Sequence, residues 1–163
     1  MKTNRADIRK HSGRWGFLFT AVLFMVAASL LNRPIQTKAS GNVVMAADVF
    51  EEVNDIRAYY GLDDLYWDDS LATCASVRAV ESSTFFSHTR PDGTPWYTIN
   101  PAEMEGENLL WTSIDRNEVE IVSLWMQSPS HRALILDNGF DTMGIAGYTA
   151  ADGVHYWVIE FGY

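Results

Sequence analysis

A single cysteine, Cys74, limits how this chain can fold, because one thiol cannot form an internal disulfide. Stability must therefore come mainly from the burial of apolar side chains. Hydrophobic residues make up 47% of the 163-residue sequence and aromatic residues 13%, which is enough for one core. Cys74 shares a helical stripe with Leu71 and Ala75, so we expect its thiol to be buried and unreactive.

The first 47 residues differ from the rest in charge and hydropathy. Their seven basic residues oppose one acidic residue, and an uncharged apolar run covers residues 17–31. This layout, followed by small residues at 44–47, is typical of a secretory signal peptide. The run is short for a bilayer-spanning helix, which needs about 17–25 residues. A cleaved signal peptide and an uncleaved N-terminal membrane anchor are therefore both open, and either one places the domain outside the cytoplasm.

Residues 48–163 form the predicted domain, and this segment is strongly acidic. Five arginines oppose 20 aspartate and glutamate residues, which gives a formal charge of −15. This charge keeps the domain soluble and repels both phosphate backbones and anionic lipid surfaces. We therefore expect no nucleic acid partner, and contact with a membrane only through an uncleaved leader.

Apolar spacing predicts two helices in the first half of the domain. Residues 48–60 carry apolar side chains at helical intervals and end before Gly61, a natural helix stop. Residues 70–83 repeat this pattern after Asp68 and Asp69, which can cap the helix N-terminus. Residues 85–100 are then rich in turn signals, so we expect a loop there.

A third helix and a short fourth helix are predicted in the second half. Asp115 and Glu118 have the spacing of a capping box that opens a helix ending at residue 127. Ser128 is placed to cap a short helix that has Pro129 at its first position.

Three strands complete the predicted domain, at residues 106–112, 142–149 and 154–162. The last two strands are joined through the turn dipeptide at 152–153, so the fold class is α+β with an antiparallel ending. Six aromatic residues can fill the core or line an apolar groove, and we predict mainly core positions for them. They are Tyr59, Tyr60, Tyr66, Trp67, Trp96 and Trp111.

Two histidines stand in polar segments rich in turn residues, and they are the candidate functional residues. His88 lies in FSHTRPDG and His131 in SPSHRA, with Glu107 between them in GENL. Two imidazoles and one carboxylate can hold a divalent metal such as Zn²⁺, with water in the fourth position, or relay a proton. His131 is expected in the first turn of its helix, where the positive helix end disfavours the imidazolium form. The alternative is that both histidines hydrogen-bond loop backbone and only shape the surface.

These segments, in this order, resemble the CAP superfamily, also called the SCP domain, and its bacterial branch in particular. The matching motifs are FSH-x-RPDG, GEN and W-M-x-SP-x-HR-x-x-IL, with RA-x-E before them and YWV-x-x-FG at the end, across residues 48–163. The resemblance implies a three-layer α-β-α sandwich with a small antiparallel sheet and a histidine-lined cleft. Eukaryotic relatives are usually stapled by disulfides, which this chain lacks.

The resemblance also implies which residues line the cleft. His88, Glu107 and His131 match the family's first histidine, the acid of its GEN motif and its second histidine. The second acid of many eukaryotic members follows the tryptophan of the third helix, where this chain has WMQS and no carboxylate. Glu81, in the RA-x-E motif, is the candidate for a substitute carboxylate. Other supporting residues are Asn108, expected to bond backbone, with Ser128 and Arg132.

Three functions compete at this stage. The first, which we favour, is a secreted or surface-exposed domain that binds a protein, lipid or small molecule and is not an enzyme. It requires no cofactor. The second is a metal-dependent, peptidase-like hydrolase in which His88 and His131 hold Zn²⁺ and Glu107 is the base. The third is a lipid- or sterol-binding protein, as reported for some family members.

Overall fold

The structure is a computed structural model that describes residues 46–163. The predicted leader, residues 1–47, lies outside the described residues except for its last two positions, so its fate stays a prediction. Within residues 46–163, none of the helices is both long enough and apolar enough to cross a bilayer.

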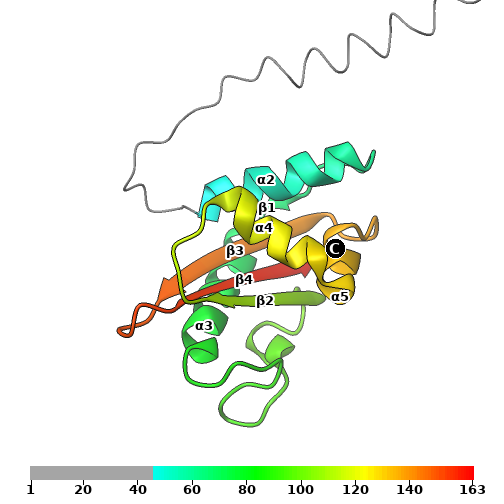
Figure 1. Cartoon of the computed structure of the whole chain (residues 1–163). Helices are drawn as coiled ribbons and strands as arrows, with labels where there is room; N and C mark the ends of the chain where they lie inside the picture. The colour runs from blue at the N-terminus through cyan, green and yellow to red at the C-terminus, as the bar shows by residue number, and fades with distance from the viewer. Residues whose placement is uncertain (1–45) are drawn as a thin grey trace, which may run out of the picture. The chain divides into compact units, whose positions relative to one another are not determined.

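A four-stranded sheet forms the middle of the domain (Figure 1). Its strands are β1 (Tyr66–Trp67), β2 (Gly106–Thr112), β3 (Thr142–Thr149) and β4 (His155–Gly162), in the spatial order β1-β3-β4-β2. The three longer strands are antiparallel, as predicted, and β1 pairs with β3 in parallel. The sequence analysis missed β1, because two residues are too few to show an alternating pattern.

Helices cover both faces of the sheet, which confirms the predicted α-β-α sandwich (Figure 1). On one face lie α2 (Ala46–Tyr59), α4 (Glu118–Gln127) and α5 (Pro129–Ile135), and α3 (Asp69–Ser82) lies on the other. Successive side chains of β4 point to opposite faces of the sheet, so this strand contributes to the packing on both sides. Trp157, Ile159 and Phe161 pack into the core beneath α2 and α4, whereas Val158 packs against α3.

Small residues allow α3 to lie close to the sheet. Ala75 and Ala79 on the helix meet Leu109 and Val158 on the strands in one buried cluster. The approach is closest at Gly144, where an added Cβ would stand 2.0 Å from the backbone nitrogen of Ala72. No side chain fits there, so α3 can dock in this position only over a glycine.

Two polar residues of α2 fasten that helix to neighbouring loops. Asn54 exchanges two hydrogen bonds with the backbone of Leu65, at 3.0 and 2.9 Å. The buried Arg57 donates to the carbonyl oxygens of Asp63, Ile135 and Asp137, at 2.8–2.9 Å. Burial of these donors is tolerated because each finds an acceptor.

The helix caps confirm one prediction and correct two. Asp68 caps α3, since its carboxylate accepts from the backbone N–H of Leu71 at 2.8 Å. The capping box of α4 is formed by Asn117 and Glu120, so the prediction of Asp115 and Glu118 was wrong by two residues. Both pairs have the same spacing, and only the path of the entering loop decides between them.

Asp115, in the loop between β2 and α4, instead places its carboxylate 3.0 Å from Nε2 of His155, the first residue of β4. The second correction concerns α5, where Ser128 occupies the N-cap position but makes no capping hydrogen bond. Its hydroxyl lies 3.2 Å from that of Ser130.

The prediction that six aromatic residues lie mainly in the core was wrong. Trp96 is half-buried and the other five are exposed, namely Tyr59, Tyr60, Tyr66, Trp67 and Trp111. The main core consists instead of aliphatic residues and Met143 with four other aromatic residues, namely Trp125, Phe140, Trp157 and Phe161. Cys74 is buried, as predicted, and burial raises the pKa of its thiol.

Candidate functional site

Glu107 occupies a buried position on β2, on the sheet face that carries α3. Its carboxylate is held by the guanidinium of Arg78, with Nε 2.6 Å from Oε2 and Nη2 3.3 Å from Oε1. Both side chains are fully buried. The bidentate contact stabilises this buried ion pair, because either charge alone would be strongly destabilising away from water.

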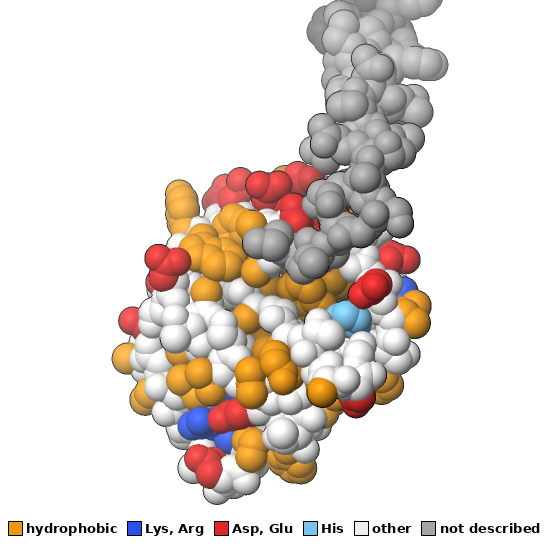
Figure 2. Space-filling view, turned by 90° about the vertical axis from the view of Figure 1, so that its left-hand side faces the viewer, with side chains coloured by type: hydrophobic (Ala, Val, Ile, Leu, Met, Phe, Trp, Pro, Cys, Tyr) orange, Lys and Arg blue, Asp and Glu red, His pale blue; other side chains and the backbone are white. Residues whose placement is uncertain are grey.

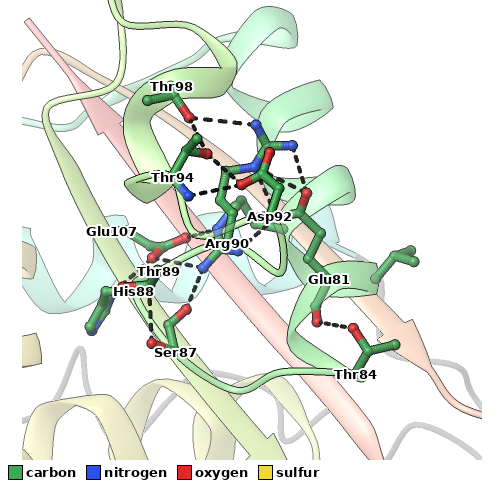
Figure 3. A network of polar contacts seen from close by, with 12 residues as sticks. Glu81, Thr84, Ser87, His88, Thr89, Arg90, Asp92, Thr94, Thr98 and Glu107 are labelled. Carbon is green, nitrogen blue, oxygen red and sulfur yellow. Dashed lines mark hydrogen bonds and ion pairs between the residues drawn. The ribbon is translucent and has the colours of Figure 1, made fainter.

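The ion pair of Arg78 and Glu107 belongs to a longer chain of charged groups. Figure 3 shows Glu107, Glu81 and Arg90 of this chain. Nη1 of Arg78 also contacts Glu81 at 2.8 Å, and Glu81 accepts from Arg90 at 2.6 Å. Although burial raises the pKa of Glu81, the hydrogen bonds from Arg90 and Arg78 hold it below its usual value. Glu81, the predicted substitute carboxylate, is therefore an ion-paired member of this network.

The loop that carries His88 is fixed by this network and by its own turn. Nη2 of Arg78 donates to the carbonyl oxygen of Ser87 at 2.6 Å. Asp92 accepts from the backbone N–H and the hydroxyl of Thr94, at 2.9 and 2.6 Å (Figure 3). The side chain of His88 is therefore presented from a well-bonded loop.

His88 connects the buried network to the surface. Its Nδ1 lies 2.8 Å from Oε1 of Glu107, while 56% of its side chain is exposed. A carboxylate accepts hydrogen bonds, so Nδ1 carries the proton in this contact. In the neutral ring Nε2 then bears the lone pair, and within residues 46–163 it has no hydrogen-bond partner.

His131 lies near His88, in the first turn of α5 as predicted. Burial lowers the pKa of His131, and the neighbouring His88 lowers it further. Its ring is therefore neutral at pH 7. The side-chain amide of Asn108 donates to the backbone carbonyl of His131 at 3.0 Å, which confirms the predicted backbone role of Asn108.

Glu160 is the residue that the sequence analysis missed. It lies directly opposite Glu107 in the β2–β4 ladder and is fully buried. Neither of its carboxylate oxygens has a hydrogen-bond partner within residues 46–163. Burial raises the pKa of Glu160 well above its usual value, and the charge of Glu107 adds to this rise. Burial and the neighbouring carboxylate therefore both favour the protonated form of Glu160. Its only sequence signal is a charged residue inside an apolar strand.

Ser128 and Arg132 lie outside this network. Arg132 hydrogen-bonds the hydroxyl of Tyr60 at 3.0 Å and stands over its ring at 5.2 Å. Two concavities of about 310 Å³ each lie over α2, α4 and α5, and both are lined by Met126. Neither is lined by His88, Glu107 or His131.

The fit of the site to a metal ion follows from these contacts. Across residues 46–163, no group of three or more histidine, cysteine, aspartate or glutamate side chains is arranged to hold a metal ion. Both oxygens of Glu107 are already engaged by Arg78 and His88. The residues fit a metal only through the imidazoles of His88 and His131, with Glu107 orienting His88 from behind.

Known proteins with similar sequences and structures complete the description. Residues 50–161 match the model of the cysteine-rich secretory protein family, abbreviated CAP. An uncharacterized protein of Borreliella burgdorferi is 24% identical over 150 residues, which cover 89% of this chain and 92% of that protein.

Two solved structures share the fold. An outer surface protein from Borrelia burgdorferi is similar with a TM-score of 0.59 and 22% identity, covering 70% of this chain and 88% of that one. An extracellular protein with an SCP domain from Bacillus anthracis has a TM-score of 0.57 and 22% identity. That match covers 71% of this chain and 39% of the other.

Proposed function

Because the chain belongs to the cysteine-rich secretory protein family, we propose that it is a secreted or surface-exposed binding domain, and not an enzyme. In this proposal the domain binds a ligand or a protein partner at the surface around His88 and His131. The outer surface and extracellular location of two structural relatives supports the location. The basic, apolar leader supports export.

The observation that carries the non-enzymatic proposal is the buried pair of Arg78 and Glu107. A general base must be able to take a proton from a substrate or water within hydrogen-bond reach. Glu107 is buried, and both its oxygens already accept hydrogen bonds. To act as a base it would have to leave Arg78, which would strand a buried guanidinium. The network therefore favours a rigid support for the His88 loop.

Zinc binding is the second candidate, supported by the neutral ring of His131 beside His88. Neutral imidazoles are ligands that Zn²⁺ prefers, and Glu107 would fix the orientation of the His88 ring. A bound Zn²⁺ would supply a Lewis acid at the surface. The hydrolase alternative requires this metal and a free base, whereas a binding domain requires neither. A lipid or sterol ligand is a further alternative within the binding proposal.

Calorimetric titration of Zn²⁺ into the full chain tests the metal candidate. Micromolar binding that is lost in the His88→Ala/His131→Ala double variant would establish the imidazole pair as a metal site. His155→Ala is the matched control, because His155 lies at the far end of β4 and pairs with Asp115. Equal binding by the double variant and the wild type would exclude the site.

Hydrolysis assays then test the non-enzymatic proposal. We expect no turnover of peptide or ester substrates by the full chain, with or without Zn²⁺. Turnover that disappears in His88→Ala, but persists in His155→Ala, would refute the proposal and favour the hydrolase.

A further inference from the structure

Three aromatic side chains form a row across the sheet, on the face that carries α3. Trp111 on β2 is paired with Tyr156 on β4, and Tyr156 is paired with Tyr148 on β3. Directly paired residues of antiparallel strands point to the same face, so the three side chains leave adjacent strands on one side of the sheet. Trp111 is 53% exposed and Tyr148 38% exposed, with Tyr156 half-buried between them.

Phe86 extends this row from the loop that follows α3. Its ring centroid lies 6.4 Å from that of Tyr156, and the residue is 45% exposed. The four residues Phe86, Tyr148, Tyr156 and Trp111 are called the aromatic row below. They come from four separate segments, which is why the sequence does not show them as a motif.

The row is exposed because α3 ends before it. The helix covers the preceding sheet positions, where Ala75 and Ala79 pack on Leu109 and Val158, and it stops at Ser82. The strands continue past that point toward the β3–β4 turn (Figure 1). Viewed from the side to which this turn points, the surface shows several separate hydrophobic patches among uncharged and charged side chains (Figure 2).

Sheet stability alone does not account for the row. Cross-strand aromatic pairs do stabilise sheets, but aliphatic or threonine side chains also suit an exposed strand end. Contiguous exposed aromatic surface usually marks an interaction site. Within residues 46–163, the indole N–H of Trp111 and the hydroxyls of Tyr148 and Tyr156 make no hydrogen bond. A ligand can therefore meet both flat apolar faces and polar groups at their rims.

Charge selects among the ligands that stack on aromatic rings. Nucleic acid bases stack well, but the formal charge of −15 over residues 48–163 repels their phosphates. It repels anionic polysaccharides and anionic lipid surfaces for the same reason. Pyranose rings with equatorial substituents are flat and uncharged, present apolar C–H faces, and carry hydroxyls at their edges. They match the row in shape, polarity and charge.

We propose that the aromatic row binds a neutral polysaccharide of β-1,4-linked pyranose rings. Strands of a sheet are about 4.8 Å apart, so the row from β2 to β3 spans about 10 Å, room for more than one sugar ring. The Trp111 N–H and the tyrosine hydroxyls then bond the sugar hydroxyls. This site is distinct from the one proposed around His88 and goes beyond it, although Phe86 belongs to the same loop as His88.

The probe for this proposal is the hexamer of β-1,4-linked N-acetylglucosamine, titrated calorimetrically into the full chain, with retention on insoluble cellulose as a second readout. Trp111→Ala and Tyr156→Ala should each weaken binding about tenfold, the loss typical of one stacking ring. Trp111→Phe keeps a ring and should retain most of the affinity. Tyr59→Ala, which removes a 77% exposed aromatic side chain from α2 on the other side of the sheet, should change nothing.

Several outcomes would overturn the proposal. The first is that neither carbohydrate binds. The second is that binding survives Trp111→Ala and Tyr156→Ala in variants whose thermal unfolding matches the wild type. Binding to neutral phosphatidylcholine vesicles that depends on the same residues, without carbohydrate binding, would assign the row to a membrane surface instead. The His88→Ala/His131→Ala variant should still bind the hexamer. Carbohydrate binding therefore tests the aromatic row independently of the site proposed around His88.

Discussion

Replacement of Glu160 by glutamine tests whether burial raises the pKa of this carboxyl group. Glutamine has nearly the same shape as a protonated glutamate but cannot ionise. Glu160 is fully buried opposite Glu107, and burial together with that carboxylate raises its pKa well above the usual value. The other groups acting on it are Arg78, which lowers the pKa, and Cys74. The variant therefore removes a titration and leaves the packing in place.

The sign follows from proton binding. In the unfolded chain Glu160 loses its proton at the ordinary glutamate pKa, whereas the folded domain retains the proton to a higher pH. The stability from this raised pKa is complete below the unfolded value and is lost as the pH rises through the folded one. In that window, unfolding of the wild type becomes easier by roughly 1 kcal/mol per pH unit. Glu160→Gln lacks this slope, so its free energy of unfolding should rise relative to that of the wild type as the pH rises through this window.

Urea unfolding followed by tryptophan fluorescence measures this difference. The free energy of unfolding is determined for both proteins at half-unit steps from pH 5 to pH 8. All other ionisable groups are shared, so the difference between the two curves isolates Glu160. Parallel curves would refute the reasoning, because they would mean that Glu160 titrates alike in the folded and unfolded chains.

Other contacts give three further predictions. Arg78→Met should destabilise the domain by about 3–5 kcal/mol in urea unfolding, because it leaves the buried Glu107 carboxylate without its guanidinium partner. A loss below about 1 kcal/mol would contradict this role of the ion pair. Gly144→Ala should abolish cooperative thermal unfolding, since the new Cβ would overlap the backbone of α3. Gly139→Ala, whose new Cβ meets only the side chains of Asp137 and Tyr163, should unfold like the wild type. Asn117→Ala should lower the free energy of unfolding by about 1 kcal/mol, because it removes the α4 cap, and Asp115→Ala should lower it less. A larger loss for Asp115→Ala in urea unfolding would favour Asp115 as the cap.

Much of the secondary structure could be predicted from local sequence. The helices α2 and α3 and the strands β2, β3 and β4 lie within two residues of their predicted bounds. Periodicity, turn residues and the Asp68 cap are local signals, so they can be read from the sequence without knowledge of the tertiary structure. The capping box of α4 was misplaced because two acceptors with the same spacing compete within one loop, and β1 was missed because it is too short.

The candidate site was predictable only as a set of residues. His88, Glu107 and His131 could be named from the motifs, and the structure pairs His88 with Glu107. The partners that define their chemistry were not visible. Arg78 lies 29 positions before Glu107, and no local pattern shows that its guanidinium occupies both carboxylate oxygens.

The sequence by itself determined that this chain cannot form an internal disulfide, that a basic N-terminal segment precedes an acidic one, and where most helices and strands lie. These properties follow from composition and from periods of two or 3.6 residues. Only the tertiary structure decided that Glu160 faces Glu107 and that Trp111, Tyr156 and Tyr148 form one row. Strand register and the point where α3 ends set these neighbours, because burial and pairing depend on segments far apart in the chain.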